Sequence, residues 1–307
     1  MLNITMSTKS GSTVAFITLP SDPGEKGVEQ KEKEVKPIIN TTPEKDIQLH
    51  LWRKFKSANT DGSGRSLLQN GDIHMKKCVN LPNGNMIFSE PNHKLIDIYD
   101  QEGTYVNRFY LSGRPFDIAV ITNRFVAISY GESQYVEILD LKTESVVKTF
   151  NWETNCFGIA VRSNCLYVVI EGSGIIVLDH VTGETLQTIP VKLSQKTFLA
   201  VADDSIIYTN WVYNSVHCLD LEGNEKWMFK KVKLNRPIGI TVTQEGELFV
   251  AGYLSGNIYF ISADGQKFKE IMKDKNIIDI DFDEKTNRLL TFKTDGSAFK
   301  YFVEYEN

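Results

Sequence analysis

The sequence predicts an all-β protein, a six-bladed β-propeller with four antiparallel strands in each blade. Short runs of β-branched and aromatic residues alternate with Asp, Asn and Gly turns over residues 75–303, which is typical of antiparallel strands. These strands recur as a unit of nearly constant length, which indicates a repeat architecture. The last unit has only three strands, and one isolated strand precedes the first unit. Together these observations predict a closed ring of blades.

The third strand of each unit measures the repeat. It ends at Asp100, Asp140, Asp179, Asp220 and Ser262, at intervals of 40, 39, 41 and 42 residues. A period near 40 with four strands per unit is typical of a propeller blade. Solenoids of similar period are helical, and helical periodicity is absent here.

The six expected blades follow one another along the chain. They cover residues 75–111, 114–150, 157–189, 198–229, 234–272 and 277–303. The fifth contains the clearest copy, at 234–265, with strands at 238–243, 247–251 and 257–262. Gln244-Glu245-Gly246 and Ala263-Asp264-Gly265 supply its turns. We expect the core to form where neighbouring blades pack together, with Phe116, Phe157, Phe198, Trp227 and Phe282 among its aromatic residues.

The isolated strand is expected at residues 46–56, DIQLHLWRKFK, where apolar and polar side chains alternate. We predict that it becomes the outer strand of the three-stranded last blade and closes the ring. Closure removes open sheet edges, which would otherwise pair with other chains. The propeller domain is therefore expected to span residues 45–307.

Residues 1–44 are expected to form a flexible charged linker or tail. Their segment GEKGVEQKEKEVKP at 24–37 alternates charges and offers little apolar surface to bury. The alternative is a tail that binds a partner.

Composition limits the function classes. The 307 residues are 41% hydrophobic and 24% charged, with a net charge of −5, which disfavours broad nucleic-acid binding, so no DNA partner is expected. No apolar run is long enough for a membrane helix, and no signal peptide begins the chain. Cys78, Cys156, Cys165 and Cys218 are scattered, which favours reduced thiols in a cytoplasmic protein.

The fifth copy resembles the NHL-repeat consensus. Residues 236–240 read Arg-Pro-Ile-Gly-Ile, a Gly turn follows, and the copy ends with Asp264-Gly265. In the first copy, Asn92-His93-Lys94-Leu95 is close to the Asn-His-Leu element that gives this repeat its name. Copies two to four depart from the consensus. Six such blades behind a charged segment also resemble the C-terminal part of tripartite-motif proteins, particularly the divergent mollusc set. The resemblance implies a substrate- or RNA-recognition role within a ubiquitin-ligase architecture.

No enzymatic constellation is evident in the sequence. The chain has no zinc-ligand array, so ligase activity would need RING and B-box modules from outside it. The five histidines, His50, His74, His93, His180 and His217, show no metal-ligand spacing, and no nucleophile elbow or phosphate-binding loop occurs. We therefore expect no catalytic residues, no bound metal and no cofactor.

A metal site is the alternative, and its candidate ligands are Asp279, Asp281 and Asp283. At a period of two they share one strand face, where carboxylates about 7 Å apart are able to hold Ca²⁺. They do not match an EF-hand loop, because Glu284 stands at the sixth position and Leu290 at the twelfth. The simpler interpretation is that Ile278, Ile280 and Phe282 form the buried face and the aspartates face water in the channel or at its edge.

One set of residues points to binding. In a propeller, the loops that lead into first strands and the loops between second and third strands lie on one face. Alignment of the blades two residues before the aromatic or aliphatic residue of each first strand gives Lys76, Arg114, Asn155, Lys196, Arg236 and Asn276. Other loops on this face contribute His93, Tyr130, Trp211, Tyr213 and Tyr253.

Cations interleaved with aromatic residues suit an anionic ligand. We expect a non-catalytic module that binds a protein or peptide partner, since an acidic segment would pair with the cations. Single-stranded RNA is the alternative ligand, because its bases stack on aromatic rings and its phosphates contact cations. A lactonase- or lyase-type propeller enzyme is the less favoured possibility. It also stays open that these loops are polar only because they are exposed, and that Arg-Pro merely belongs to the repeat.

Overall fold

The structure is a computed structural model and describes residues 3–9, 12–18, 46–56 and 76–306. The chain divides into two compact units, 1–36 and 37–307. In the first unit, β1 (Asn3–Lys9) and β2 (Ser12–Thr18) pair as an antiparallel hairpin. These two strands were not expected from the sequence, because the charged segment that follows dominates the composition of the tail. That segment, on which the linker prediction depends, lies outside the described residues.

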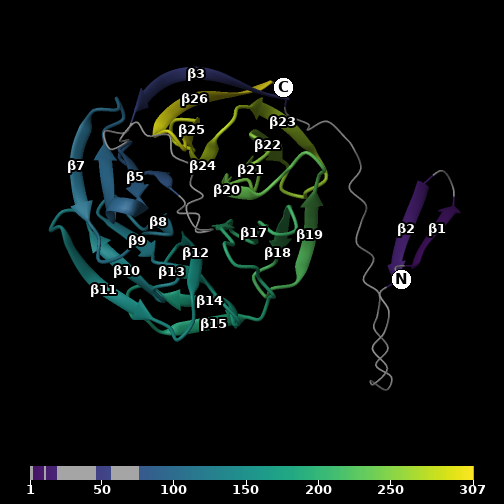
Figure 1. The fold of residues 1–307 in the computed structure, drawn as a ribbon, viewed down its shortest axis with the longest axis horizontal. Coiled ribbons are helices and arrows are strands. Elements are labelled where there is room, and N and C mark those ends of the chain that lie inside the picture. Colours follow the sequence, from purple (N-terminus) through teal and green to yellow (C-terminus); the bar gives the residue numbers. More distant parts are fainter. Residues whose placement is uncertain (1–2, 10–11, 19–45, 57–75, 307) are drawn as a thin grey trace. The chain divides into compact units, whose positions relative to one another are not determined.

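The second unit is a ring of six four-stranded antiparallel sheets, which confirms the predicted fold class (Figure 1). Blade 1 contains β4 (Cys78–Asn80), β5 (Met86–Glu90), β6 (Leu95–Tyr99) and β7 (Tyr105–Tyr110). Blade 2 contains β8 (Asp117–Val120), β9 (Phe125–Ser129), β10 (Tyr135–Asp140) and β11 (Ser145–Asn151). Blade 3 contains β12 (Cys156–Arg162), β13 (Cys165–Ile170), β14 (Gly174–Asp179) and β15 (Thr185–Ile189).

The other three blades repeat this arrangement. Blade 4 contains β16 (Leu199–Val201), β17 (Ile206–Asn210), β18 (Ser215–Leu219) and β19 (Glu225–Lys230). Blade 5 contains β20 (Pro237–Val242), β21 (Leu248–Gly252), β22 (Asn257–Ile261) and β23 (Phe268–Lys273). Blade 6 contains β24 (Ile277–Asp283), β25 (Arg288–Lys293), β26 (Ser297–Glu306) and β3 (Asp46–Lys56). A single 3-10 turn, η1 (Pro91–His93), joins β5 to β6.

The first strands line the centre of the ring and the fourth strands form its rim (Figure 1). Around the centre, β4 contacts β8, β8 contacts β12, β12 contacts β16, β16 contacts β20 and β20 contacts β24. Strand β24 in turn contacts β4, so the ring is closed on the inside.

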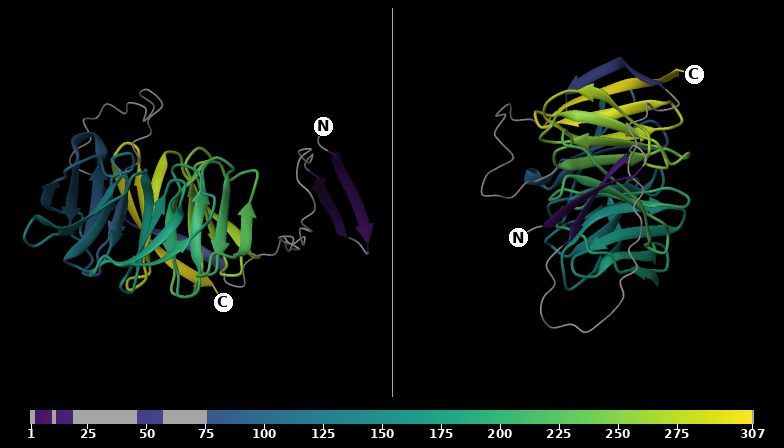
Figure 2. Two further views of the ribbon diagram at one scale, coloured as in Figure 1. Left: turned by 90° about the horizontal axis from the view of Figure 1, so that it is seen from below. Right: turned by 90° about the vertical axis from the view of Figure 1, so that its right-hand side faces the viewer.

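The rim is closed by β3, as the sequence predicted. It pairs with β26 in antiparallel register from Asp46–Glu306 to Lys56–Ser297, and the two strands run side by side in Figure 2. The far end of β3 also reaches blade 1. Phe55 packs against Phe88, with ring centroids 5.7 Å apart, and Arg53 donates a hydrogen bond of 2.7 Å to the carbonyl of Glu102. The strand therefore connects the last blade to the first.

The core lies between the blades. Apolar side chains from the facing sheets of neighbouring blades form clusters between blades 1 and 2, 2 and 3, 3 and 4, and 5 and 6. A further cluster joins blades 4 and 5 and extends to blades 6 and 1. This confirms the expected inter-blade core. Among the described residues, all four cysteines are free thiols and no helix is long and apolar enough to cross a membrane.

Ile47 provides a test of the rim closure. It is 2% exposed and packs between blades 5 and 6 with Phe249, Phe260 and Val303. We expect Ile47→Ala to lower the free energy of unfolding by about 2–5 kcal/mol, because a buried aliphatic side chain is replaced by a cavity. Leu51→Ala in the same strand is the control, since Leu51 is 59% exposed. Equal effects of the two substitutions in urea unfolding would contradict this account of closure.

Candidate functional site

One side of the ring carries the loops that lead into first strands and the loops between second and third strands, and we call it the loop face. It includes loops 190–198, 211–214, 231–236 and 253–256. The aligned positions on this face share a local structure. Lys196, Arg236 and Asn276 all have left-handed backbones, with φ of 62°, 51° and 69°. The carbonyl groups of Asn155, Arg236 and Asn276 each accept a hydrogen bond of 2.9–3.0 Å from the residue that follows the second strand. The aligned positions of blades 5 and 6 thus show both features, that of blade 4 shows only the left-handed backbone, and that of blade 3 shows only the hydrogen bond.

Not every aligned side chain is free to bind a ligand. Lys76 is buried, and its ammonium lies 2.5 Å from the carboxylate of Glu90. The side-chain amide of Asn155 donates to Glu171 over 2.8 Å. Arg114 is exposed at the start of blade 2. The six positions therefore do not form a continuous basic ring.

The aromatic candidates also separate into two groups. Tyr130 is buried, and its hydroxyl donates to Glu137 over 2.7 Å, so this tyrosine belongs to the core. His93 is exposed on η1 of blade 1. Trp211 and Tyr213 lie in the loop between β17 and β18 of blade 4, and Tyr253 lies in the loop between β21 and β22 of blade 5.

Trp211 is the centre of the strongest cluster on the loop face. The guanidinium carbon of Arg236 lies 4.6 Å from the centroid of its ring, and the ammonium of Lys196 lies 6.0 Å away. Tyr253 is nearly parallel to it, at 15° and 6.3 Å between centroids, and burial raises the pKa of this tyrosine. Four of the residues that the sequence singled out are therefore brought together here.

Hydrogen bonds hold the loops around Trp211 in place. The Asn214 side chain accepts a bond of 2.8 Å from the backbone N–H of Arg236, and the Arg236 carbonyl accepts one of 2.9 Å from the N–H of Tyr253. The carbonyl of Asn235 accepts a bond of 3.2 Å from the N–H of Leu254. Loop 231–236 is thus joined to the loops on both sides of it.

Exposed apolar side chains surround this cluster. Tyr213 is 64% exposed, and Val212, Val232 and Leu254 are more than half exposed as well. The cations Lys230 and Lys233 are exposed beside them. We call the whole group the Trp211 patch: Lys196, Trp211, Val212, Tyr213, Lys230, Val232, Lys233, Arg236, Tyr253 and Leu254. It is an exposed apolar surface bordered by positive charge.

The ring also encloses a channel of about 440 Å³, lined by the six first strands. Its lining is buried near Lys77, Asp117 and Asp279 and becomes exposed at Pro82 and Glu284, in the turns that follow first strands. The channel therefore opens on the side opposite the loop face, which we call the turn face.

A buried ionic cluster occupies the deep end of the channel. The Lys77 ammonium lies 2.7 Å from Asp279, 3.4 Å from Asp117 and 4.7 Å from the centroid of the Phe198 ring. Burial alone would lower the pKa of Lys77, but the two carboxylates raise it above its usual value. The lysine of blade 1 thus carries a charge between carboxylates of blades 6 and 2.

The same carboxylates satisfy backbone groups of neighbouring blades. First strands are sheet edges, so half of their N–H groups lack a partner within the blade. Asp279 accepts a bond of 2.8 Å from the N–H of Cys78, and Asp117 one of 3.0 Å from the N–H of Ile159. Asp281 accepts one of 2.7 Å from the N–H of Asn80. Side chains from one blade therefore complete the hydrogen bonding of the next.

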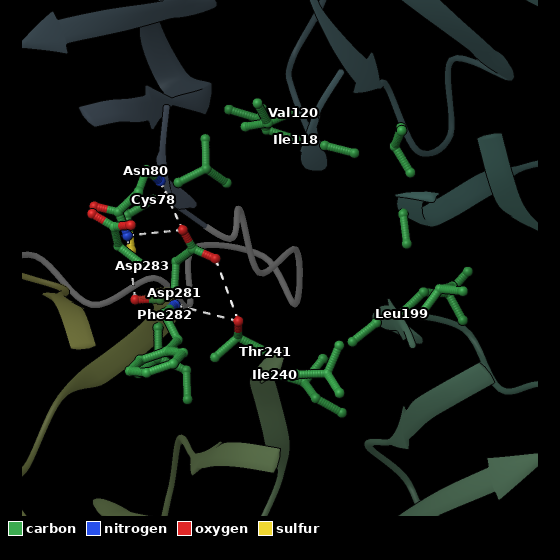
Figure 3. A pocket seen from close by; sticks show the side chains of 18 of the residues that line it. Cys78, Asn80, Ile118, Val120, Leu199, Ile240, Thr241, Asp281, Phe282 and Asp283 are labelled. Carbon is green, nitrogen blue, oxygen red and sulfur yellow. Dashed lines mark hydrogen bonds between the residues drawn. The ribbon is translucent and has the colours of Figure 1, made fainter. Parts of the chain in front are cut away.

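The three aspartates of β24 do not act as one set. The expectation that all of them face water is wrong for Asp279, which is fully buried because Lys77 compensates its charge. Asp281 lines the channel, and burial raises its pKa to about 7 (Figure 3). Asp283 accepts bonds from Thr286 and from the N–H of Lys285. Within the described residues, no group of three or more His, Cys, Asp or Glu side chains is placed to hold a metal ion.

His217 lies on the third strand of blade 4, and His180 lies in the turn after the third strand of blade 3. His217 bridges Ser215 and Glu225 at 2.9 and 2.7 Å and stacks on Tyr208. Lys77, Asn80 and Asp117 were not predicted as site residues from the sequence. The sequence feature that marks these residues is a charged or polar side chain inside an otherwise apolar first strand. This feature becomes informative only once the facing blade is known.

Comparison with known proteins does not place the chain in a family. No family model matches it, and neither does any curated protein. The six-bladed propeller therefore follows from the structure. The NHL-type repeat remains a resemblance, carried by residues 234–265 and by 92–95.

The ionic cluster predicts a large effect for Lys77→Met. Loss of the ammonium leaves Asp117 and Asp279 buried without a counter-charge, which typically costs about 3–5 kcal/mol. We expect a loss of this size in urea unfolding, and partial recovery when Asp279→Asn is added. Lys142→Met, at an exposed position, is the control. A loss in the double variant as large as in Lys77→Met alone would contradict the assigned pairing.

Asp281 predicts a pH dependence of stability. The carboxyl of Asp281 has a pKa of about 7 in the folded state and of about 3.9 in the unfolded state. Between about pH 4 and pH 7 it is therefore protonated in the folded protein and ionised in the unfolded protein. This carboxyl therefore lowers the free energy of unfolding as the pH rises from about 4 to 7. We expect Asp281→Asn to reduce that fall by at least about 1.4 kcal/mol, the equivalent of one pKa unit. Parallel pH profiles of the two proteins in chemical denaturation would refute this.

Proposed function

We propose that the chain is a non-catalytic recognition module that binds an acidic segment of a partner protein, with apolar anchor residues, on the Trp211 patch. The observation that carries the proposal is the position of Arg236 and Lys196 over Trp211, next to the exposed Tyr213, Val212 and Leu254. Aromatic residues and arginine contribute most of the energy in typical protein interfaces.

The charge of the patch supports an acidic partner. The chain as a whole carries a net charge of −5, whereas the patch combines Lys196, Lys230, Lys233 and Arg236. A carboxylate that binds between Arg236 and Lys196 would form charge-assisted hydrogen bonds in a site partly shielded from water by the rings. The hydrogen-bonded loops reduce the ordering cost of binding, since loop 231–236 is already fixed.

A specific observation favours a protein over single-stranded RNA. Three of the exposed apolar side chains are aliphatic, namely Val212, Val232 and Leu254. Aliphatic surface suits the apolar side chains of a peptide, whereas RNA readers rely on aromatic platforms and cations. RNA is retained as an outcome of the test.

The resemblance to NHL propellers extends this proposal. In that setting the propeller would be the substrate-recognition part of a ubiquitin ligase of the tripartite-motif type, and catalysis would come from other modules. The support is the Arg236–Ile240 segment and the six-bladed ring.

The test is a selection of random displayed peptides on the intact protein. We expect enriched peptides to place Asp or Glu beside Leu, Phe or Trp. In fluorescence anisotropy, Lys196→Gln with Arg236→Gln should weaken binding of an enriched peptide about 10- to 100-fold, as expected for the loss of one or two charge-assisted contacts.

Arg114→Gln is the matched control, because Arg114 is an exposed arginine at the aligned position of blade 2, across the ring from blade 5. Equal weakening by Arg114→Gln, or enrichment of peptides without acidic residues, would contradict the proposal. Tighter binding of labelled oligouridine than of any peptide, lost steeply with added salt, would replace it with RNA recognition.

A further inference from the structure

The central channel opens on the turn face and is not used by the Trp211 patch. Its volume of about 440 Å³ is within the range of small-molecule sites in proteins. Its two sides differ in chemistry, and this difference limits the kind of ligand that fits.

One side of the channel offers a carboxylate oxygen that is able to accept further hydrogen bonds. Asp281 Oδ2 accepts bonds of 2.7 and 2.9 Å from the backbone and side chain of Asn80 (Figure 3). Among the described residues, Asp281 Oδ1 has only the Thr241 hydroxyl, at 3.5 Å. A ligand at this place must therefore donate hydrogen bonds.

Apolar side chains line much of the rest of the channel. In Figure 3, Ile118 and Val120 of β8 and Leu199 of β16 lie across the opening from Asp281, and Ile240 of β20 lies beside Thr241. A ligand that spans the channel would rest its carbon skeleton on these side chains, where removal of apolar surface from water is favourable.

The cations along the channel are already engaged. Lys77 is paired with Asp279 and Asp117, and Arg162 with Asp203. The Lys285 ammonium donates to the carbonyl of Pro82 over 3.2 Å. The lining as a whole holds five acidic and three basic residues, so the channel is negative.

We propose that this channel binds a small organic cation, an alkylammonium ion whose N–H group donates to Asp281 Oδ1 while its chain lies against Ile118, Val120 and Leu199. A divalent metal ion fits this side less well. Calcium takes six to eight oxygen ligands, and Asp279, another carboxylate on β24, is held by Lys77.

The experiment is a titration of the intact protein at pH 8 with n-butylammonium, followed by the chemical shifts of backbone amides in NMR spectra. The matched probes are n-butanol, which lacks the charge, and n-butyrate, which reverses it. We expect saturable shifts on the first strands for n-butylammonium and at least 10-fold weaker binding of both other probes.

Asp281→Asn should weaken n-butylammonium binding at least 10-fold, and Glu132→Gln, at an exposed loop of blade 2, should leave it unchanged. Val120→Phe, which fills the channel from the apolar side, should also abolish binding, so the conclusion does not depend on one variant. Wild-type affinity in Asp281→Asn, equal binding of n-butanol, or shifts confined to the loop face would overturn the proposal. Binding of Ca²⁺ in place of n-butylammonium would overturn it as well.

Discussion

Closure of the ring is the constraint on which the rest of the structure depends. It is made twice, by the pairing of β3 with β26 at the rim and by the contact of β24 with β4 at the centre. The inner closure is polar. Asp279 accepts the N–H of Cys78 and pairs with Lys77, so the junction between the last and first blades contains a buried charge pair. A buried pair is a poor source of stability, but a missing partner costs several kcal/mol. The pair therefore favours one register of the junction over others.

A closed ring gives the two faces different properties. On the loop face, loops from separate blades are joined by hydrogen bonds such as that between Asn214 and Arg236. On the turn face, the channel is open, and its deep end lies at the buried Lys77. A broad exposed patch suits a macromolecule, and an enclosed channel suits a small ligand. The two proposed binding sites therefore lie on opposite faces of the ring and take different classes of ligand.

Much of the fold could be predicted because it depends on local signals. The period near 40, the turn residues and the unpaired strand at 46–56 are all visible in one sequence. The site could be predicted only in part. Lys196 and Arg236 were found by alignment of the blades, and Trp211 and Tyr253 by their position in other loops of the same face. The burial of Lys76 beside Glu90 depends on packing that the alignment does not contain. The Lys77 cluster was missed because its members lie more than 30 residues apart in three blades.

The central functional claim is that the loops around Trp211 hold a partner. Amide hydrogen exchange of the protein, with and without a saturating acidic peptide selected on it, measures this directly. The account predicts slower exchange at 211–214, 231–236 and 253–256, with no change in the turns of the opposite face at 202–205 and 243–247. Protection of those turns, or of the loops of blades 1 and 2 instead, would contradict it.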